Sequence, residues 1–444
     1  MTDITIIGAG VSSVFLAYSL MNKHEGISIH VIDKGKELNR RSCGLERGES
    51  CSCEQGCSKY LGFAGLGKSE GKFNYTNDFG GELGRKIRNE KTMQLMQEVD
   101  RILCSFGADR VNLYSTKNDR LSARASCHAL KVLSTEVRHL GTTLAEEIFQ
   151  KMYEVLEKRV QFTFEAEVQH IEKDKNFKIE TNKETFSSEK VVLATGMSGS
   201  RWFNKQTHQL GLYPGETRLD LGIRVEMRGD QLESILKDTF ETKLTYFGDD
   251  YSATTYCMNP KGRVIRKYQH GLVMPDGQNQ REKDSPSDNL NFTLFVPRYY
   301  ATYEEAINKA ESVIKPINRN SDRIVVQRLM DFKNDRSAND SRTGSIIPSL
   351  ECETGRLNEE VPVLYQRALL DFFEALEGLL GERLDPDTLL YGIDAKFYEP
   401  KLYTDYRFET EVRGLYLIGD CSGETHSLSQ AAASGIYLSD ILTS

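Results

Sequence analysis

The sequence predicts an α/β protein with a three-layer domain, in which a parallel sheet lies between helices and a β-meander, and with a second domain of mixed α+β structure. Three observations predict this class. Residues 4–33 are patterned as strand, glycine-rich turn, helix and strand. Residues 165–196 alternate as antiparallel strands do and then end in an apolar strand. Residues 414–442 repeat the strand, turn and helix order near the other end of the chain.

The first of these segments has the pattern of a dinucleotide-binding turn. The β-branched run Ile4–Ile7 suits a strand that is buried on both faces, and two glycines follow it directly. The first glycine permits a tight turn, and the second lets a pyrophosphate approach the backbone at the helix N-terminus, while a serine keeps the third position small. The next strand ends in an aspartate that is placed to bind ribose hydroxyls. A structural turn without a ligand is the alternative; otherwise we expect contacts from Gly8, Gly10, Ser13, Asp33 and Lys34.

Three later segments favour FAD over NAD. The strand 414–420 ends in Gly-Asp and leads to a helix whose N-terminus would stabilise the negative charge of a reduced flavin. This segment resembles one in FAD-dependent enzymes of the glutathione-reductase-like superfamily, and the resemblance implies a Rossmann-like domain. The strand 190–196 ends in Ala-Thr-Gly, which is frequent in this superfamily, and a valine in the meander matches one whose backbone often contacts adenine. The expected cofactor contacts are Val168, Ala194, Thr195, Gly196, Gly419, Asp420, Ser427, Leu428 and Ser429. Since no second glycine fingerprint follows a strand, a nicotinamide donor, NAD(P)H, would bind only transiently.

The segment GFAGLGKSEGKFN, residues 62–74, has the pattern of a glycine-rich loop, and segments 137–143, 220–226, 257–265 and 327–335 are further motifs in the middle of the chain. In these segments the chain resembles a family of largely uncharacterised bacterial and archaeal FAD-dependent dehydrogenases. The resemblance implies FAD as cofactor and adds Gly62, Ala64 and Gly65 to the cofactor contacts. It implies no substrate, because the family has no general assigned reaction. The chain departs from the family pattern at Glu70, Met197 and Trp202, and in the loop after Gly419.

A short loop holds four of the nine cysteines, namely Cys43, Cys51, Cys53 and Cys57. Their spacing fits neither paired zinc ligands nor ferredoxin-type runs. Plain reduced thiols, a redox pair formed by Cys53 and Cys57, and a metal site all stay open, and we name no metal ligand.

We expect a discontinuous FAD-binding domain in residues 1–211 and 386–444, with a substrate or cap domain in residues 212–385 between the two parts. His426 is a candidate to move a proton at the flavin, with a loop histidine bonded to backbone as the alternative. Glu424 is the next candidate, against a solvated loop carboxylate. Lys72 is a candidate to stabilise flavin or substrate anions, against a surface lysine.

These features predict an FAD-dependent oxidoreductase that transfers a hydride or electron pair between a small organic substrate and flavin. A flavin monooxygenase and a non-catalytic flavoprotein that acts as a redox sensor or scaffold are the alternatives. With 57 Lys and Arg against 65 Asp and Glu the net charge is -8, so we expect no nucleic acid partner. Because no apolar stretch has the length of a membrane span and no secretory signal is visible, we expect no membrane partner and a cytoplasmic location.

Overall fold

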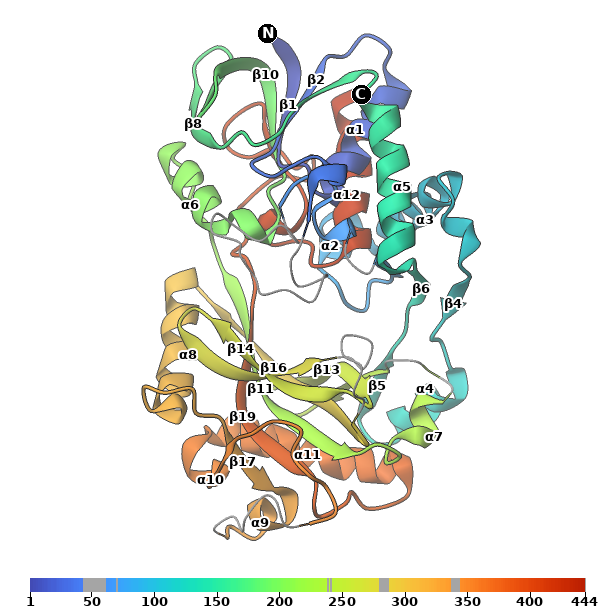
Figure 1. Cartoon of the computed structure of the whole chain (residues 1–444), viewed down its shortest axis with the longest axis vertical. Helices are drawn as coiled ribbons and strands as arrows, with labels where there is room; N and C mark the ends of the chain where they lie inside the picture. The colour runs from blue at the N-terminus through green and yellow to red at the C-terminus, as the bar shows by residue number, and fades with distance from the viewer. Residues whose placement is uncertain are drawn as a thin grey trace. The chain divides into compact units, whose positions relative to one another are not determined.

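A computed structural model describes residues 1–42, 61–68, 71–237, 239, 242–278, 287–336 and 344–443 (Figure 1). The chain forms two compact units and crosses between them four times. Unit 1 comprises Met1–Ser115, Thr135–Gly215 and Glu399–Ser444, and unit 2 comprises Thr116–Ser134 and Glu216–Tyr398. This division differs from the predicted ranges in three places, because residues 116–134 and 386–398 belong to unit 2 and residues 212–215 belong to unit 1.

Five parallel strands form the centre of unit 1, in the order β7-β2-β1-β10-β20. Parallel neighbours need a crossover connection, and helix α1 (Val11–Lys23) makes the first one. At the carboxyl ends of the strands Ile7 pairs with Leu193, which in turn pairs with Leu417. The strands are β1 (Thr2–Ile7), β2 (Ile29–Ile32), β7 (Val160–Thr163), β10 (Thr185–Leu193) and β20 (Leu415–Leu417).

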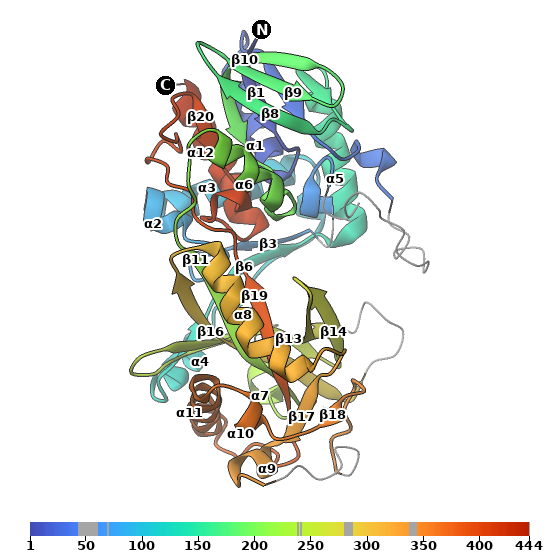
Figure 2. The ribbon, with the colours of Figure 1, turned by 90° about the vertical axis from the view of Figure 1, so that its left-hand side faces the viewer.

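The long strand β10 also belongs to an antiparallel meander with β8 (Val168–Lys173) and β9 (Phe177–Thr181) (Figure 2). Neighbouring side chains of β10 enter different cores, because successive residues of a strand point to opposite faces. Val192 packs in the core beneath the helices, whereas Val191 and Leu193 pack in the core beneath the meander. The sheet therefore lies between a helical layer and a meander layer, and the predicted fold class is confirmed.

The helical layer brings the two ends of the chain together. Helix α12 (Leu428–Thr443) packs directly against α1, and Figure 1 shows the two side by side. Gly435 permits this approach, since a Cβ there would lie 2.2 Å from the Ser12 carbonyl oxygen. Helices α3 (Asn89–Ser105) and α5 (Gly141–Leu156) contribute to the same core.

The remaining elements of unit 1 are short. Strands β3 (Lys72–Tyr75), β4 (Leu113–Ser115) and β6 (Glu136–His139) form a small antiparallel sheet. The others are helices α2 (Leu83–Ile87) and α6 (Ser200–Gln209) and the 3-10 turns η1 (Leu38–Arg40), η3 (Gly65–Lys68), η4 (Ala108–Arg110), η5 (Met197–Gly199) and η7 (Asp420–Ser422).

Unit 2 is built on an eight-stranded sheet in the order β18-β17-β19-β11-β16-β13-β12-β5. Its strands are β5 (Leu130–Leu133), β11 (Thr217–Arg228), β12 (Lys243–Phe247), β13 (Ser252–Pro260), β16 (Asn289–Tyr300), β17 (Val325–Arg328), β18 (Glu353–Thr354) and β19 (Leu389–Phe397). A separate hairpin consists of β14 (Arg263–Gln269) and β15 (Leu272–Gln278). The helices are α4 (Asp119–Ser126), α7 (Glu233–Leu236), α8 (Tyr303–Asn318), α9 (Leu329–Lys333), α10 (Leu357–Glu360) and α11 (Val363–Leu380).

One face of this sheet is apolar and the other carries buried charges. Arg224 is 1% exposed and donates from Nη1 to Thr293 Oγ1 at 2.9 Å. Thr293 in turn donates to Asp394 Oδ2 at 2.8 Å, and Lys267 Nζ of the hairpin lies 2.6 Å from Asp394 Oδ1. Buried ions are tolerated only when they are paired in this way. None of the described helices in either unit is both long and apolar enough to cross a bilayer.

Candidate functional site

The glycine turn after β1 adopts a conformation that needs its first glycine. Gly8 has φ +101°, and a Cβ at this position would lie 2.4 Å from the Ala194 carbonyl oxygen. The Gly8 N–H donates to Ile32 O at 2.8 Å, and Ser13 Oγ donates to Gly8 O at 2.5 Å. The serine at the third position of the motif thus holds the turn against the first turn of α1.

Asp33 lies beside this turn. Its carboxylate accepts the Ala9 N–H at 2.7 Å and the Gly35 N–H at 2.6 Å. Burial raises the pKa of Asp33, while these backbone donors and the positive charge of Arg41 act in the opposite direction. Gly62 gives the carboxylate a third backbone hydrogen bond. A carboxylate offers about four acceptor positions, so one remains for a ligand hydroxyl.

The loop before β3 reaches the same turn. The Ala64 N–H donates to Ala9 O at 2.8 Å, and Ala64 forms an isolated bridge with Gly10. Gly62 and Gly65 have positive φ values of +101° and +48° on either side of it. Gly10 caps α1 without a side-chain hydrogen bond, and the first turn of α1 has no acidic residue. These are the features of a helix N-terminus that accepts an anion.

The start of the meander adjoins the Asp33 end of the site. The Ala166 N–H donates to Asp33 O at 3.0 Å, which places Val168 two residues further along the chain. Val168 is buried and begins β8. Lys34 differs from the other predicted contacts, because its Nζ forms an exposed ion pair with Glu167 at 2.8 Å.

The Ala-Thr-Gly segment passes across the glycine turn. The Ala194 N–H donates to Ile7 O at 2.9 Å, and Thr195 Cα approaches within 3.0 Å of the position of a Gly8 Cβ. Gly196 follows with φ +58°. Beneath this segment the thiol of Cys421 is buried, which raises its pKa to about 12 and keeps it neutral at physiological pH.

The Gly-Asp segment after β20 closes on α1. Gly419 has φ +72°, and a Cβ there would lie 2.6 Å from Ser12 Oγ. Its N–H donates to Ser434 Oγ of α12 at 3.1 Å. Asp420 accepts the Thr425 hydroxyl at 2.7 Å. The predicted contacts at the two ends of the chain are therefore brought to one edge of the sheet of unit 1.

The start of α12 carries a buried hydroxyl without a partner. Ser427 Oγ accepts the Gln430 N–H at 3.3 Å, and the helix begins at Leu428. Ser429 is fully buried, and its Oγ has no hydrogen-bond partner within the described part of the chain. A buried hydroxyl of this kind is costly unless a ligand or water bonds it.

The loop 424–427 holds two of the three candidate catalytic residues. The His426 backbone N–H donates to Gly80 O at 2.9 Å, and its side chain is partly exposed. The Glu424 carboxylate is partly buried and pairs with Lys86 Nζ at 3.4 Å and Lys401 Nζ at 3.9 Å. Lys401 also pairs with Glu82, so Glu424 belongs to a cluster of two lysines and two carboxylates.

Lys72 begins β3, opposite His139 of β6. Strand β3 contacts α12, the helix that follows the loop 424–427. Just after the strand, the Thr76 carbonyl oxygen accepts Gln430 Nε2 of this helix at 3.2 Å.

Sequence reasoning missed three residues that hold the loop in place. Gly80 and Gly81 lie so close to it that a Cβ at Gly80 would meet Ser427 Oγ at 2.8 Å and one at Gly81 would meet Gln430 Oε1 at 2.4 Å. Gly81 also bridges Thr425, and Gln430 is fully buried. The adjacent glycines after Phe79 are a turn signal, but nothing local shows which segment approaches them.

The cysteine loop lies outside the described residues, so the three interpretations of Cys43, Cys51, Cys53 and Cys57 stay open. Within the residues that are described, no group of three or more His, Cys, Asp or Glu side chains has the arrangement of a metal site.

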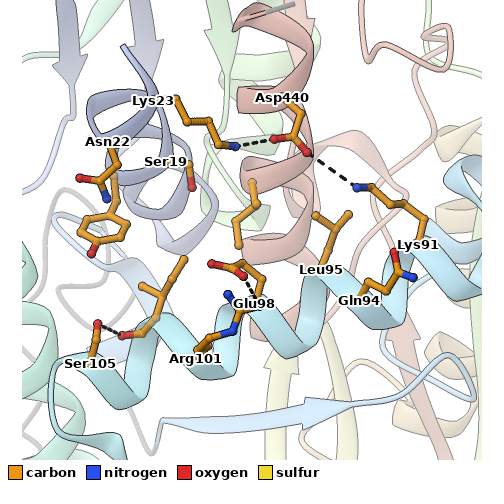
Figure 3. A pocket seen from close by; sticks show the side chains of 13 residues that line it. Ser19, Asn22, Lys23, Lys91, Gln94, Leu95, Glu98, Arg101, Ser105 and Asp440 are labelled. Carbon is orange, nitrogen blue, oxygen red and sulfur yellow. Dashed lines mark hydrogen bonds and ion pairs between the residues drawn. The ribbon is translucent and has the colours of Figure 1, made fainter. Parts of the chain in front are cut away.

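A groove of about 630 Å³ lies at a different place, between α1, α3 and α12 (Figure 3). It is lined by the C-terminal halves of α1 and α12, whereas the predicted contacts lie at the N-terminal ends of these helices. Its charged side chains pair with one another, as Lys23 does with Asp440 and Arg101 with Glu98. The groove is thus separate from the candidate site.

The chain matches no protein-family model and no curated protein. Among solved structures it is similar to L-proline dehydrogenase from P. horikoshii, with 12% identity over 99% of this chain and 93% of that chain and a TM-score of 0.41. Glycine oxidase from Geobacillus kaustophilus gives 11% identity, 99% and 94% coverage and a TM-score of 0.39. L-Amino acid deaminase from Proteus myxofaciens gives 12% identity, 100% and 90% coverage and a TM-score of 0.37. These likenesses are too distant to carry an argument, and the fold class stands on the strand topology itself.

Proposed function

We propose that the protein is an FAD-dependent oxidoreductase that transfers a hydride or electron pair between a small organic substrate and flavin. One observation carries the proposal: the glycine turn after β1, the Ala-Thr-Gly segment after β10 and the Gly-Asp segment after β20 meet at the carboxyl edge of one parallel sheet. In sheets of this class ligands bind outside the carboxyl ends of the strands.

The residues present fit a ligand with two different ends. Asp33 offers an acceptor for a ribose hydroxyl, and Val168 offers backbone groups for an adenine nearby. The uncapped N-terminus of α1 at Gly10 suits a pyrophosphate. The unpartnered Ser429 hydroxyl at the start of α12 suits a polar ring edge.

The chain's own residues would bind and orient the cofactor, and a bound flavin would supply the chemistry of hydride or electron-pair transfer. The N-terminus of α12 favours negative charge on a ring beside it, since its first N–H groups lack intrahelical acceptors. We assign to the imidazole of His426 the task of holding or accepting a proton at one of its ring nitrogens. The lysine and carboxylate cluster around Glu424 keeps the loop in place.

The proposal names the substrate only as a small organic molecule, and it includes NAD(P)H as a partner that binds transiently. A flavin monooxygenase or a redox sensor would use the same cofactor residues, so turnover decides among them. A product that gains an oxygen atom from O₂ would favour the monooxygenase, and flavin that is reduced without any turnover would favour the sensor.

The proposal is tested by the flavin content of the purified protein and of two matched aspartate variants. Asp33→Ala removes the predicted ribose acceptor at the carboxyl edge, and we expect FAD affinity to fall about 10- to 100-fold, as for loss of a charged hydrogen bond. The control is Asp3→Ala at the opposite end of β1, where Asp3 Oδ2 accepts the Ser28 N–H at 2.8 Å.

The control variant should bind FAD as the unaltered chain does. Protein that releases no FAD on denaturation and takes up none when it is supplied would refute the proposal. Equal losses in the two variants would show that only general stability had changed.

A further inference from the structure

The outer strand of the meander in unit 1 is covered by one face of a helix. Strand β8 is the edge of its sheet, and edge strands carry backbone groups without a neighbouring strand. Gln206 of α6 satisfies two of these groups, since its Oε1 accepts the Ile171 N–H at 3.1 Å and its Nε2 donates to Gln169 O at 2.9 Å. Three side chains at i, i+4 and i+7 of α6 reach β8, namely Trp202, Gln206 and Gln209.

Trp202, the first of these three side chains, bonds the residue that is predicted to contact adenine. The indole Nε1–H of Trp202 donates to the Val168 carbonyl oxygen. The register between β8 and β9 shifts just after Val168, and such bulges redirect the backbone groups beside them. Trp202 is partly buried and packs against the core beneath the meander, so the donor is held in place by its own ring.

We propose that Trp202 is a positioning residue for the adenine of the bound cofactor and makes the site selective for a base with an exocyclic amino group. This inference rests on the proposed function. A carbonyl oxygen has two acceptor positions, and the indole occupies one of them at Val168. In this proposal the second acceptor position takes the donor of the incoming base.

The selectivity depends on whether the base presents a hydrogen-bond donor or an acceptor to the Val168 oxygen. The amino group of adenine donates a hydrogen bond, and Val168 O accepts it. Hypoxanthine carries a carbonyl oxygen in place of that amino group, and it would face the Val168 oxygen with no proton between them. The indole N–H cannot compensate, because Trp202 is a donor only and its proton is already used. The position of Val168 agrees with this role, since Ala166 links it to the ribose side at Asp33.

The test compares FAD, ADP, IDP and FMN as ligands of the full chain and of Trp202→Phe. Phe keeps an aromatic ring and removes the N–H. We expect Trp202→Phe to weaken FAD and ADP about five- to tenfold and to leave FMN, which lacks adenine, unchanged. The unaltered chain should prefer ADP to IDP by at least about tenfold, and the variant should lose part of this preference.

Two controls separate positioning from general stability. Gln206→Met removes the neighbouring contacts of the same helix face, and Gln209→Ala removes the contact between Gln209 Oε1 and His170 Nδ1, which are 3.2 Å apart. Both controls should keep the ratio of FAD to FMN affinity and the preference for ADP over IDP. The inference is overturned if either control changes these ratios as Trp202→Phe does, or if Trp202→Phe weakens FMN as much as FAD.

A spectroscopic measurement tests the inference independently. Trp202 is the only tryptophan of the chain, so the intrinsic tryptophan emission reports on this position alone. ADP should change the emission, and ribose 5-phosphate should not. If FAD and ADP bind while the emission stays constant, the base does not lie beside Trp202. If the unaltered chain binds neither FAD nor ADP, the proposed function fails together with this inference.

Discussion

At the scale of single residues, two buried polar groups of unit 1 differ in their surroundings. The Ser429 hydroxyl at the carboxyl edge of the sheet has no hydrogen-bond partner among the described residues, whereas His30 lies inside the sheet itself. His30 is fully buried on β2, shares a hydrogen bond between Nε2 and Thr163 Oγ1 at 2.8 Å and packs edge-on against Phe186. It is a structural histidine, and its environment has a consequence for stability.

We predict that His30 makes unit 1 sensitive to acid. Burial lowers the pKa of His30 from 6.5 to about 4, so the unfolded chain binds a proton at a pH where the folded chain does not. The contribution of the neutral His30 to the free energy of unfolding is fully present above about pH 6.5. It is lost as the pH decreases towards 4, by about 3 kcal/mol in total. Urea unfolding at several pH values in this window measures the free energy of unfolding. Its slope against pH should be smaller for His30→Leu than for the unaltered chain. His24→Gln, an exposed control, should keep the slope of the unaltered chain, and equal slopes for all three proteins would contradict the prediction.

At the scale of elements, the pairing between the β14–β15 hairpin and the main sheet of unit 2 depends on a buried charge. Asp394 is 1% exposed, and burial raises its pKa while Lys267 acts in the opposite direction. Gly277 of the hairpin lies so close to the sheet that a Cβ there would meet the Arg224 guanidinium. The hairpin therefore cannot shift without separating charges.

We predict that Lys267→Met lowers the free energy of unfolding by about 3 kcal/mol at neutral pH, because it leaves the Asp394 carboxylate buried with less compensation. The loss should shrink as the pH falls, since protonation removes the charge of Asp394. Denaturant unfolding at several pH values measures both effects. Lys315→Met is the control, because Lys315 forms an exposed pair with Glu311 on α8 that is worth at most about 0.5 kcal/mol.

The elements also show what the sequence could predict. Four of the five parallel strands, β1, β2, β10 and β20, and the meander were predictable because their signals are local: β-branched runs, alternation and glycines at fixed positions. The fifth, β7, was not predicted. The domain boundaries were not predictable, since β5 at Leu130–Leu133 pairs with β12 at Lys243–Phe247, a partner over a hundred residues later. The assignment of residues 386–398 differed for the same reason, because β19 pairs with β11 and β17. Within the candidate site, the glycine turn and the aspartate after β2 were recognisable from sequence, and their role as cofactor contacts stays a prediction, whereas the placement of Gly81 and Gln430 needed the fold.

At the scale of the whole molecule, each unit has its own hydrophobic cores. One core beneath the helices and one beneath the meander belong to unit 1, and two others belong to unit 2. All predicted cofactor contacts lie in unit 1. A ligand that binds only one unit should therefore stabilise that unit alone.

We predict two unfolding transitions in calorimetry, of which FAD raises one. Free FAD at a hundred times its Kd should add about 2.7 kcal/mol to the unfolding of unit 1. The transition of unit 2, which can be identified because Lys267→Met lowers its midpoint temperature, should not move when FAD is added. Asp33→Ala should reduce the shift at the same FAD concentration. Equal shifts of both transitions would contradict this assignment.

The packing of α12 on α1 also has a consequence for how the chain is made. A ribosome completes α1 early, but the helix that covers it emerges only after every segment of unit 2 has been synthesised. During that time the part of α1 that α12 covers and the side of β10 that pairs with β20 lack these neighbours. Chains that are truncated between residues 398 and 415 and released from the ribosome should thus bind chaperones and be cleaved by proteases at α1, whereas the strands of unit 2 should already be protected.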